Sequence, residues 1–125
     1  MWSPFLCHWQ HYQNLSDAER KYDYVTVNQK CDNTLHGWYR FRGAAGTKMV
    51  TTCPPLDHCD AAFPIWLSGG HPTVAEGKVW RKARIHNFGG CYGKEVPIQV
   101  KNCGSYYIYE LGNLGSCDAR YCSTD

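Results

Sequence analysis

The sequence predicts a small single domain stapled by disulfide bonds, either all-β or β-rich α+β with one short N-terminal helix. The chain has 125 residues, of which 43% are hydrophobic and 14% aromatic, enough for one compact core. It contains eight cysteines at irregular spacings and no Cys-x-x-Cys pair. Its apolar segments mostly alternate with the two-residue period of a β-strand, and clusters of glycine and proline separate them.

The one expected helix lies between Asn14 and Lys21. Ser16 precedes Glu19 by three residues, which is the spacing of a capping box. In that motif each side chain accepts a hydrogen bond from the backbone amide of the other residue. The motif predicts a helix of one or two turns.

Four later segments are predicted strands. Residues 38–42 alternate so that Tyr39 and Phe41 share one face, and residues 78–86 alternate in the same way. Residues 98–103 and 106–111 are rich in β-branched and aromatic side chains. The short Gly-Ser connection between these last two segments predicts a tight hairpin.

The cysteines indicate an oxidising compartment. An even number of cysteines in a short chain is typical of a disulfide framework, although spacing alone leaves roughly a hundred pairings open. The alternative is zinc, because His58 stands beside Cys59 and five residues after Cys53, but this spacing is longer than closed zinc sites use. We therefore expect four disulfides, no metal and no cofactor, in a protein that is secreted or on the extracellular face of the cell surface.

Charge and motifs argue against several classes of function. The net charge of +2 is too small to indicate a nucleic-acid partner, and no window approaches the ~18 apolar residues of a membrane span. The chain has no G-x-S-x-G, no H-E-x-x-H and no phosphate-binding loop. We expect no enzyme, no nucleic acid and no membrane insertion of this domain, and a small secreted hydrolase is the weakest alternative.

A basic face on the strand at residues 78–86 is the main candidate binding site. Guanidinium groups match carboxylates and sulfates in bidentate geometry, so this face is a candidate site for acidic glycans. The alternative is a solvated strand face whose charges block aggregation. The members of this basic face are Lys78, Trp80, Lys82, Arg84 and His86.

Two smaller features have similar alternatives. Asn14-Leu15-Ser16 is an N-glycosylation sequon. A glycan at Asn14 would either be displayed to a lectin or keep the protein soluble during secretion. Trp66 and His71 lie in a segment that could form a binding loop. We expect instead that Trp66 packs in the core and that His71 orders the turn by hydrogen bonding.

An ordered set of residues resembles the eight-cysteine, uromodulin-like domain family of animal extracellular glycoproteins. The resemblance runs from about Cys7 to Cys122. Its features are Cys7 with Tyr12, Leu15, Asp17 and Arg20; Cys31-Asp32; Gly37 to Phe41; Cys53 and Cys59; Ala62 to Leu67; Gly70-His71-Pro72; Cys91; Val100 to Cys103; and Cys117 to Cys122.

The resemblance implies a single domain over residues 1–125, excised from a larger multidomain protein. It implies a non-catalytic recognition module with extracellular proteins or glycans as partners, in host–microbe or matrix interactions. It also implies the disulfides Cys7–Cys103, Cys31–Cys117, Cys53–Cys91 and Cys59–Cys122.

The chain departs from the family pattern in two respects. Relatives carry a fifth disulfide at positions that match Arg84 and Tyr92, and both cysteines are absent here. Relatives also carry sequons near positions matching residues 68–70 and 109–111, and neither is present. The glycan-display mechanism of those relatives therefore does not transfer residue by residue, and Asn14 is the candidate for an N-glycan.

Overall fold

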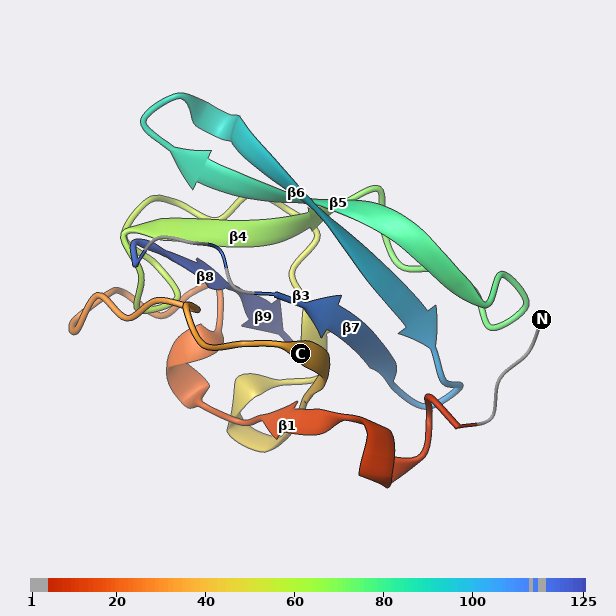
Figure 1. The fold of residues 1–125 in the computed structure, drawn as a ribbon. Coiled ribbons are helices and arrows are strands. Elements are labelled where there is room, and N and C mark those ends of the chain that lie inside the picture. Colours follow the sequence, from red (N-terminus) through yellow and green to blue (C-terminus); the bar gives the residue numbers. More distant parts are fainter. Residues whose placement is uncertain (1–4, 113, 115–116) are drawn as a thin grey trace.

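The computed structural model describes residues 5–112, 114 and 117–125 and consists mainly of strands (Figure 1). Its helical elements are single 3-10 turns, and no helix among these residues is long and apolar enough to cross a membrane. The elements in chain order are η1 (Trp9–His11), β1 (Gln13–Leu15), η2 (Ala18–Arg20), β2 (Gly37–Phe41), η3 (Gly43–Ala45), β3 (Lys48–Met49), β4 (Phe63–Ser68), β5 (Lys78–Asn87), β6 (Gly90–Asn102), β7 (Tyr107–Leu111), β8 (Ala119–Tyr121) and β9 (Ser123–Thr124).

Seven strands form the main sheet, in the order β1-β2-β7-β6-β5-β4-β8. The two outermost pairs, β1 with β2 and β4 with β8, are parallel, and the four inner pairs are antiparallel. Strands β3 and β9 pair separately. The long β5–β6 hairpin extends beyond the rest of the molecule in Figure 1, so both of its faces are partly open to solvent.

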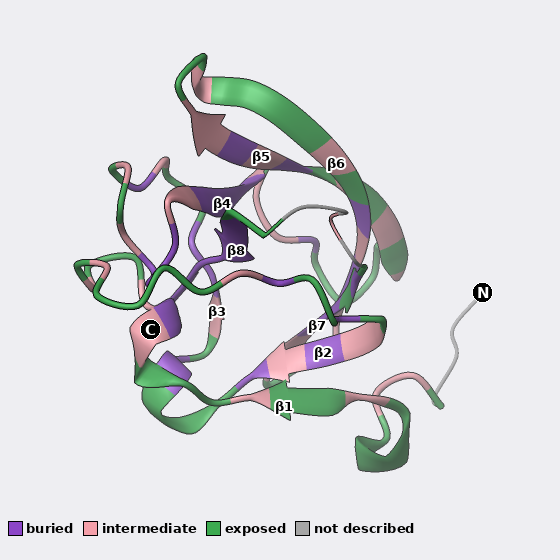
Figure 2. Cartoon of the chain, turned by 60° about the vertical axis from the view of Figure 1, so that its left-hand side comes forward, coloured by how far each residue is buried: buried purple, intermediate pink, exposed green. Residues whose placement is uncertain are grey.

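The inner face of the main sheet forms the core. Tyr39 and Phe41 of β2 are 5% and 1% exposed, as their shared face predicted. Alternate residues of the other strands join them, and buried residues are concentrated on the side of the sheet that faces the irregular segments (Figure 2). The buried core residues are Leu35, Tyr39, Phe41, Ala45, Met49, Ile65, Leu67, Ala83, Ile85, Ile98, Val100, Tyr109, Leu111, Ala119 and Tyr121.

The four predicted strands are confirmed as β2, β5, the end of β6, and β7. Asn102 pairs with Tyr107, and Gly104 has φ +98° in the turn between them, which is the expected short hairpin. The sequence did not predict β4 or the first half of β6. Glycines and Pro97 interrupt β6, and pairing along the whole of β5 holds it extended.

The predicted helix of one or two turns is shorter than expected and starts elsewhere. It is the three-residue turn η2, and its N-cap is Asp17, whose carboxylate accepts from Arg120 Nη2 at 2.9 Å and makes no capping hydrogen bond. Asn14 and Leu15 are extended in β1, which pairs with β2. The turn therefore starts one residue after Ser16, and the capping box of Ser16 and Glu19 does not form among the described residues. The turns η1 and η3 were not predicted.

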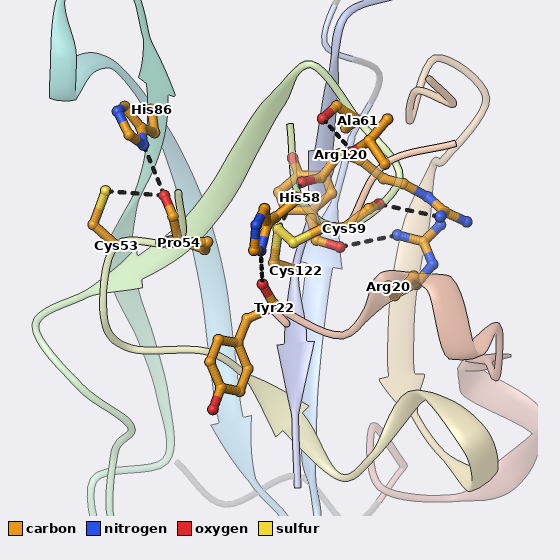
Figure 3. Close-up of a disulfide and its surroundings, with 12 residues drawn as sticks. Arg20, Tyr22, Cys53, Pro54, His58, Cys59, Ala61, His86, Arg120 and Cys122 are labelled. Atoms are coloured by element: carbon orange, nitrogen blue, oxygen red, sulfur yellow. Dashed lines mark hydrogen bonds between the residues drawn. A yellow bond between two sulfur atoms is a disulfide. The ribbon is translucent and has the colours of Figure 1, made fainter. Parts of the chain in front are cut away.

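Four disulfide bonds connect segments far apart in the sequence. They are the pairs that the resemblance implies: Cys7–Cys103, Cys31–Cys117, Cys53–Cys91 and Cys59–Cys122, with sequence separations of 96, 86, 38 and 63 residues. Figure 3 shows the Cys59–Cys122 bond, which joins the segment before β4 to the C-terminal strands. Cys59 and Cys122 are fully buried beside Val50 and Trp66 in a second apolar cluster.

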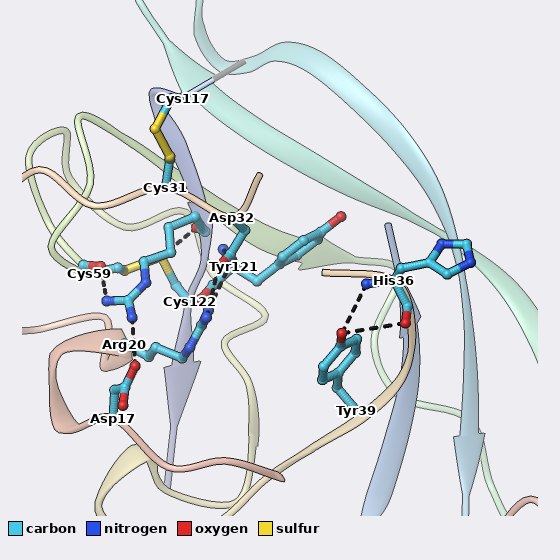
Figure 4. A network of polar contacts seen from close by, with 11 residues as sticks. Asp17, Arg20, Cys31, Asp32, His36, Tyr39, Cys59, Cys117, Tyr121 and Cys122 are labelled. Atoms are coloured by element: carbon cyan, nitrogen blue, oxygen red, sulfur yellow. Dashed lines mark hydrogen bonds and ion pairs between the residues drawn. A yellow bond between two sulfur atoms is a disulfide. The ribbon is translucent and has the colours of Figure 1, made fainter. Parts of the chain in front are cut away.

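A buried ion pair fixes the segment after β1 against β8 (Figure 4). The guanidinium of Arg20 donates to both carboxylate oxygens of Asp32, at 2.7 and 2.9 Å, and also to the carbonyl of Tyr121. Asp32 accepts in addition from the backbone amide of Tyr121 at 2.8 Å. Both charged residues are less than 5% exposed, so these hydrogen bonds replace the water that each has lost.

A second polar contact links β7 to β3 and to the loop that contains His71. The Tyr109 hydroxyl accepts from the backbone amide of Met49 at 2.9 Å and lies 2.7 Å from Nε2 of His71. Burial lowers the pKa of His71 to about 4, with smaller contributions from Lys48 and Arg81, so its imidazole is neutral and accepts a hydrogen bond from the phenol. His71 thus orders its loop through β7 rather than through the turn itself.

We expect Asp32→Ala to lower the free energy of unfolding by about 3–5 kcal/mol, because it leaves the buried Arg20 charge without its partner. Removing the exposed pair of Lys21 and Asp125 by Asp125→Ala is the matched control, with a loss of less than about 1 kcal/mol. Denaturant unfolding followed by tryptophan fluorescence measures both. Equal losses in the two variants would contradict the role given to the buried pair.

We also expect stability to fall as pH is lowered from about 6.5 to about 4, because the unfolded chain protonates His71 at its ordinary pKa of 6.5 whereas the folded chain does not. Above this window the contribution of His71 is complete. Unfolding midpoints of the native chain and of His71→Gln, measured across this range, isolate the effect because all other titrating groups are shared. Identical pH profiles would refute it.

Candidate functional site

The basic face lies on the surface of the main sheet turned away from the core, which we call the outer face. Its residues occupy alternate positions of β5, with Lys78, Trp80 and Lys82 exposed and the rest half-buried. The predicted alternation is therefore correct. The five residues nevertheless do not form one uniform cationic surface, because their neighbours on β6 and β4 differ.

Glu95 neutralises much of the charge of this face. It lies opposite Arg84 in the β5–β6 register, and its Oε2 accepts from Arg84 Nη1 at 2.6 Å. The same oxygen lies 3.7 Å from Nζ of Lys82. One carboxylate thus serves two cations, so both are less available to an anionic ligand than the sequence suggested. The sequence did not predict this role of Glu95, because it does not show which residues of β6 lie opposite those of β5.

His86 belongs to a different environment. Its Nδ1 lies 2.7 Å from the carbonyl oxygen of Pro54, beside the Cys53–Cys91 disulfide (Figure 3). Potential ligand atoms of Cys53, His86 and Cys91 lie within 4.8 Å of one another. The two sulfurs are bonded to each other, however, so they offer no thiolate to a metal. Cys59, of the weighed zinc alternative, is likewise bonded to Cys122.

Arg84 and Tyr92, the two positions where relatives carry a fifth disulfide, contact each other. The guanidinium carbon of Arg84 lies 5.0 Å from the centre of the Tyr92 ring, in a cation–π contact. Tyr92 also meets the edge of Trp66, whose indole N–H donates to the carbonyl of Cys91 at 3.0 Å. Trp66 is 6% exposed, so it is the core residue that we expected and not part of a binding loop.

Trp80 lies in a row of side chains that crosses the outer face. The strand registers place Trp80 of β5 opposite Gln99 of β6, Gln99 opposite Glu110 of β7, and Glu110 opposite Trp38 of β2. Trp80 is 63% exposed. Two members of this row, Trp80 and Glu110, line an open groove of about 410 Å³, together with His36, Gly37, Pro97, Leu111 and Gly112.

Three polar side chains at or beside this groove make no hydrogen bond or ion pair with any described residue. Among residues 5–112, 114 and 117–125, no hydrogen bond or ion pair involves the Glu110 carboxylate, the Gln99 amide or the Trp80 indole N–H. His36 is held by its backbone, whose N–H donates to the Tyr39 hydroxyl at 2.9 Å, while its imidazole points away from that contact (Figure 4). The groove therefore combines an exposed aromatic surface with unsatisfied donors and acceptors. Only the strand order reveals this combination, because the residues come from four strands.

Asn14 is exposed on β1, at the edge of the main sheet. The N-cap of the following turn is Asp17, so Ser16 is not engaged as a cap and the sequon is accessible. A glycan on an edge strand would also shield its unpaired backbone groups.

Comparison with known proteins places the chain in a family. A family model described as a uromodulin-like domain matches residues 39–123. The chain belongs to this uromodulin-like family. The disulfide pairs of the structure are the ones that this membership implies.

Related proteins match this uromodulin-like domain over nearly its whole length. It is 41% identical over 115 residues to the dog (Canis lupus familiaris) pancreatic secretory granule membrane major glycoprotein GP2, covering 91% of this chain and 23% of that protein. It is 42% identical over 113 residues to mouse (Mus musculus) uromodulin, covering 90% and 17%. The human (Homo sapiens) GP2 protein is 35% identical over 115 residues, covering 91% and 21%. The chain thus spans about a fifth of the length of these curated relatives.

We expect Asn14 to carry an N-glycan when the domain is made in a eukaryotic secretory pathway, because its sequon is exposed. Intact-mass analysis before and after removal of N-glycans measures occupancy, and Asn14→Gln is the matched control. A mass equal to that of the bare chain in both proteins would contradict the expectation.

Proposed function

We propose that this uromodulin-like domain is a non-catalytic recognition module of a secreted or cell-surface glycoprotein. Its outer sheet face contacts extracellular proteins or glycans. The observation that carries this proposal is the groove on the outer face, which is lined by the exposed Trp80 and by Glu110, whose carboxylate has no partner among the described residues. The names of the relatives, which include a secretory granule membrane glycoprotein, support the compartment.

The scaffold suits recognition because it is stiff. Disulfides at Cys7–Cys103 and Cys53–Cys91 anchor the two ends of β6, the strand at the centre of the sheet. A partner that binds this face orders few new groups, so little of the contact energy is lost as conformational entropy. Exposed aromatic side chains on such a surface are typical anchors of binding.

A second candidate function is binding of acidic glycans through the basic face. The exposed ammonium groups of Lys78 and Lys82, on one side of β5, favour it. The ion pairs of Lys82 and Arg84 with Glu95 argue against it, since an anion must displace or share that carboxylate. The two candidates differ in salt dependence, because contacts between exposed charges weaken as ionic strength rises.

The test is binding of the oxidised domain to a defined panel at low and high salt. The panel contains neutral, sialylated and sulfated glycans, heparin, fibronectin and type I collagen. We expect binding to at least one member, and loss of that binding in the outer-face variant Trp80→Ala with Lys78→Ala. The matched control, Trp9→Ala with Lys30→Ala, changes exposed residues elsewhere and retains it.

Two outcomes would reject the recognition proposal: no binding across the panel, or binding that the outer-face variant leaves intact. Retention on heparin distinguishes the acidic-glycan candidate from the first proposal. Acidic-glycan binding requires retention that falls with salt, disappears in Lys82→Glu with Arg84→Glu, and strengthens in Glu95→Gln, where the competing carboxylate is gone. If neither salt nor these substitutions change the retention of the domain on heparin, the second candidate is rejected.

A further inference from the structure

We infer that the groove beside Trp80 is a binding site for a neutral oligosaccharide, in which Trp80 is the stacking surface and Glu110 accepts hydrogen bonds from hydroxyl groups. The inference rests on the proposed function, because it assigns a ligand class to the outer face. It shares Trp80 with the acidic-glycan candidate, but it needs no positively charged side chain and it adds Glu110 as a hydrogen-bond acceptor.

Trp80 provides the apolar half of the recognition. Its indole is 63% exposed, whereas Trp66, on the same face of the sheet, is 6% exposed and hydrogen-bonded. A pyranose ring presents a flat array of C–H bonds that packs against an aromatic face, and this contact removes apolar surface of both partners from water. Pro97 continues the apolar lining next to Trp80.

Glu110 and Gln99 provide the polar half. A carboxylate accepts strong charge-assisted hydrogen bonds from hydroxyl groups, and an amide both donates and accepts. Since Trp80 and Glu110 are two strand spacings apart, their backbones are separated by about 10 Å, a span that two linked pyranose rings cover. In the strand register Gln99 lies between them, beside the residues that line the groove.

The shape of the groove also fits a short saccharide. Its volume of about 410 Å³ falls within the usual range for small-molecule sites. Gly37 and Gly112 lie along its wall, and a side chain built on either would meet no neighbouring atom within 4 Å. The groove is therefore open beside these two glycines, and His36 lines it next to them.

Charge selects a neutral ligand over an anionic one. The Glu110 carboxylate has no cation paired with it among the described residues, so it repels sulfate or carboxylate groups that enter the groove. Lys78 and Lys82 flank Trp80 on the same strand face, but neither lines the groove, and Lys82 is within 3.7 Å of Glu95. The hydroxyl groups of a neutral sugar are not repelled by this carboxylate, and they can donate hydrogen bonds to its oxygens.

The test is a titration of the oxidised, ¹⁵N-labelled domain followed by NMR. The probes are mannobiose, N,N′-diacetylchitobiose and lactose, each to about 10 mM, with a sulfated heparin disaccharide as the anionic comparison. We expect at least one neutral probe to shift the Trp80 indole N–H signal, assigned from its loss in Trp80→Phe. The shift is insensitive to salt between about 50 and 300 mM, because the ligand is uncharged.

Variants locate the site. Trp80→Ala is expected to weaken binding about tenfold or more, and Glu110→Gln by a smaller factor. The matched controls are Trp9→Ala, which removes an equally exposed tryptophan, and Asp23→Asn, which removes an exposed carboxylate. Both controls keep the native affinity. All four positions are exposed, and the dispersion of each spectrum verifies that the variant is folded.

Three results would overturn the inference: no shift with any neutral probe, shifts that persist in both Trp80→Ala and Glu110→Gln, or binding of the sulfated disaccharide alone. Binding of the sulfated disaccharide alone would be consistent with the recognition proposal, with the basic face as the binding site. If none of these saccharides shifts a signal but the domain binds fibronectin or collagen, the saccharide inference is rejected and a protein partner is supported. Silence across the whole panel would reject both proposals.

Discussion

Covalent cross-linking of distant segments is the constraint on which the rest of this domain depends. The irregular segments before β2 and before β4 are long, and each contains a cysteine, Cys31 or Cys59, that is bonded to the C-terminal part of the chain. Closing loops of this length removes roughly 4–5 kcal/mol of conformational freedom from the unfolded chain in the chain-entropy model. The bonds thereby hold these segments against β8, where Arg20 and Asp32 can pair away from water.

The two faces of the sheet are consequently free to serve different purposes. The inner face receives its cover from segments that the disulfides anchor, so it needs no large helix. The outer face is covered near Trp66, where the Cys53–Cys91 and Cys59–Cys122 bonds pack on the indole, and also at Lys101 and Ile108, which are 3% and 0% exposed. Over β5, β6, β7 and β2 it stays open at the Trp80 groove. The recognition surface that we propose thus lies on the side of the sheet opposite the main core.

Local patterns in the sequence identified four strand segments, in β2, β5, the end of β6 and β7, but not which strands lie beside them. Alternation placed Trp80 and Lys82 on one face correctly, because the two-residue period is a property of the strand alone. It could not show that Glu95 lies opposite Arg84 or that Glu110 shares a row with Trp80, because both depend on strand order and register. Similarly, Ser16 and Glu19 match a capping box, but pairing of β1 with β2 outweighs that local preference. The disulfide pairs came from the family resemblance, since spacing alone did not choose among them.

The Cys7–Cys103 bond also determines how the domain would respond to mechanical tension. The two cysteines are separated by 96 residues in the sequence, and force applied along the chain across both passes through the sulfur–sulfur bond instead of the segment between them. That segment includes β1 to β6, and therefore most of the sheet. Stretching such a molecule would lengthen it only through the residues outside this covalent loop. The domain would act as a nearly inextensible link, and its outer face would keep its shape under load.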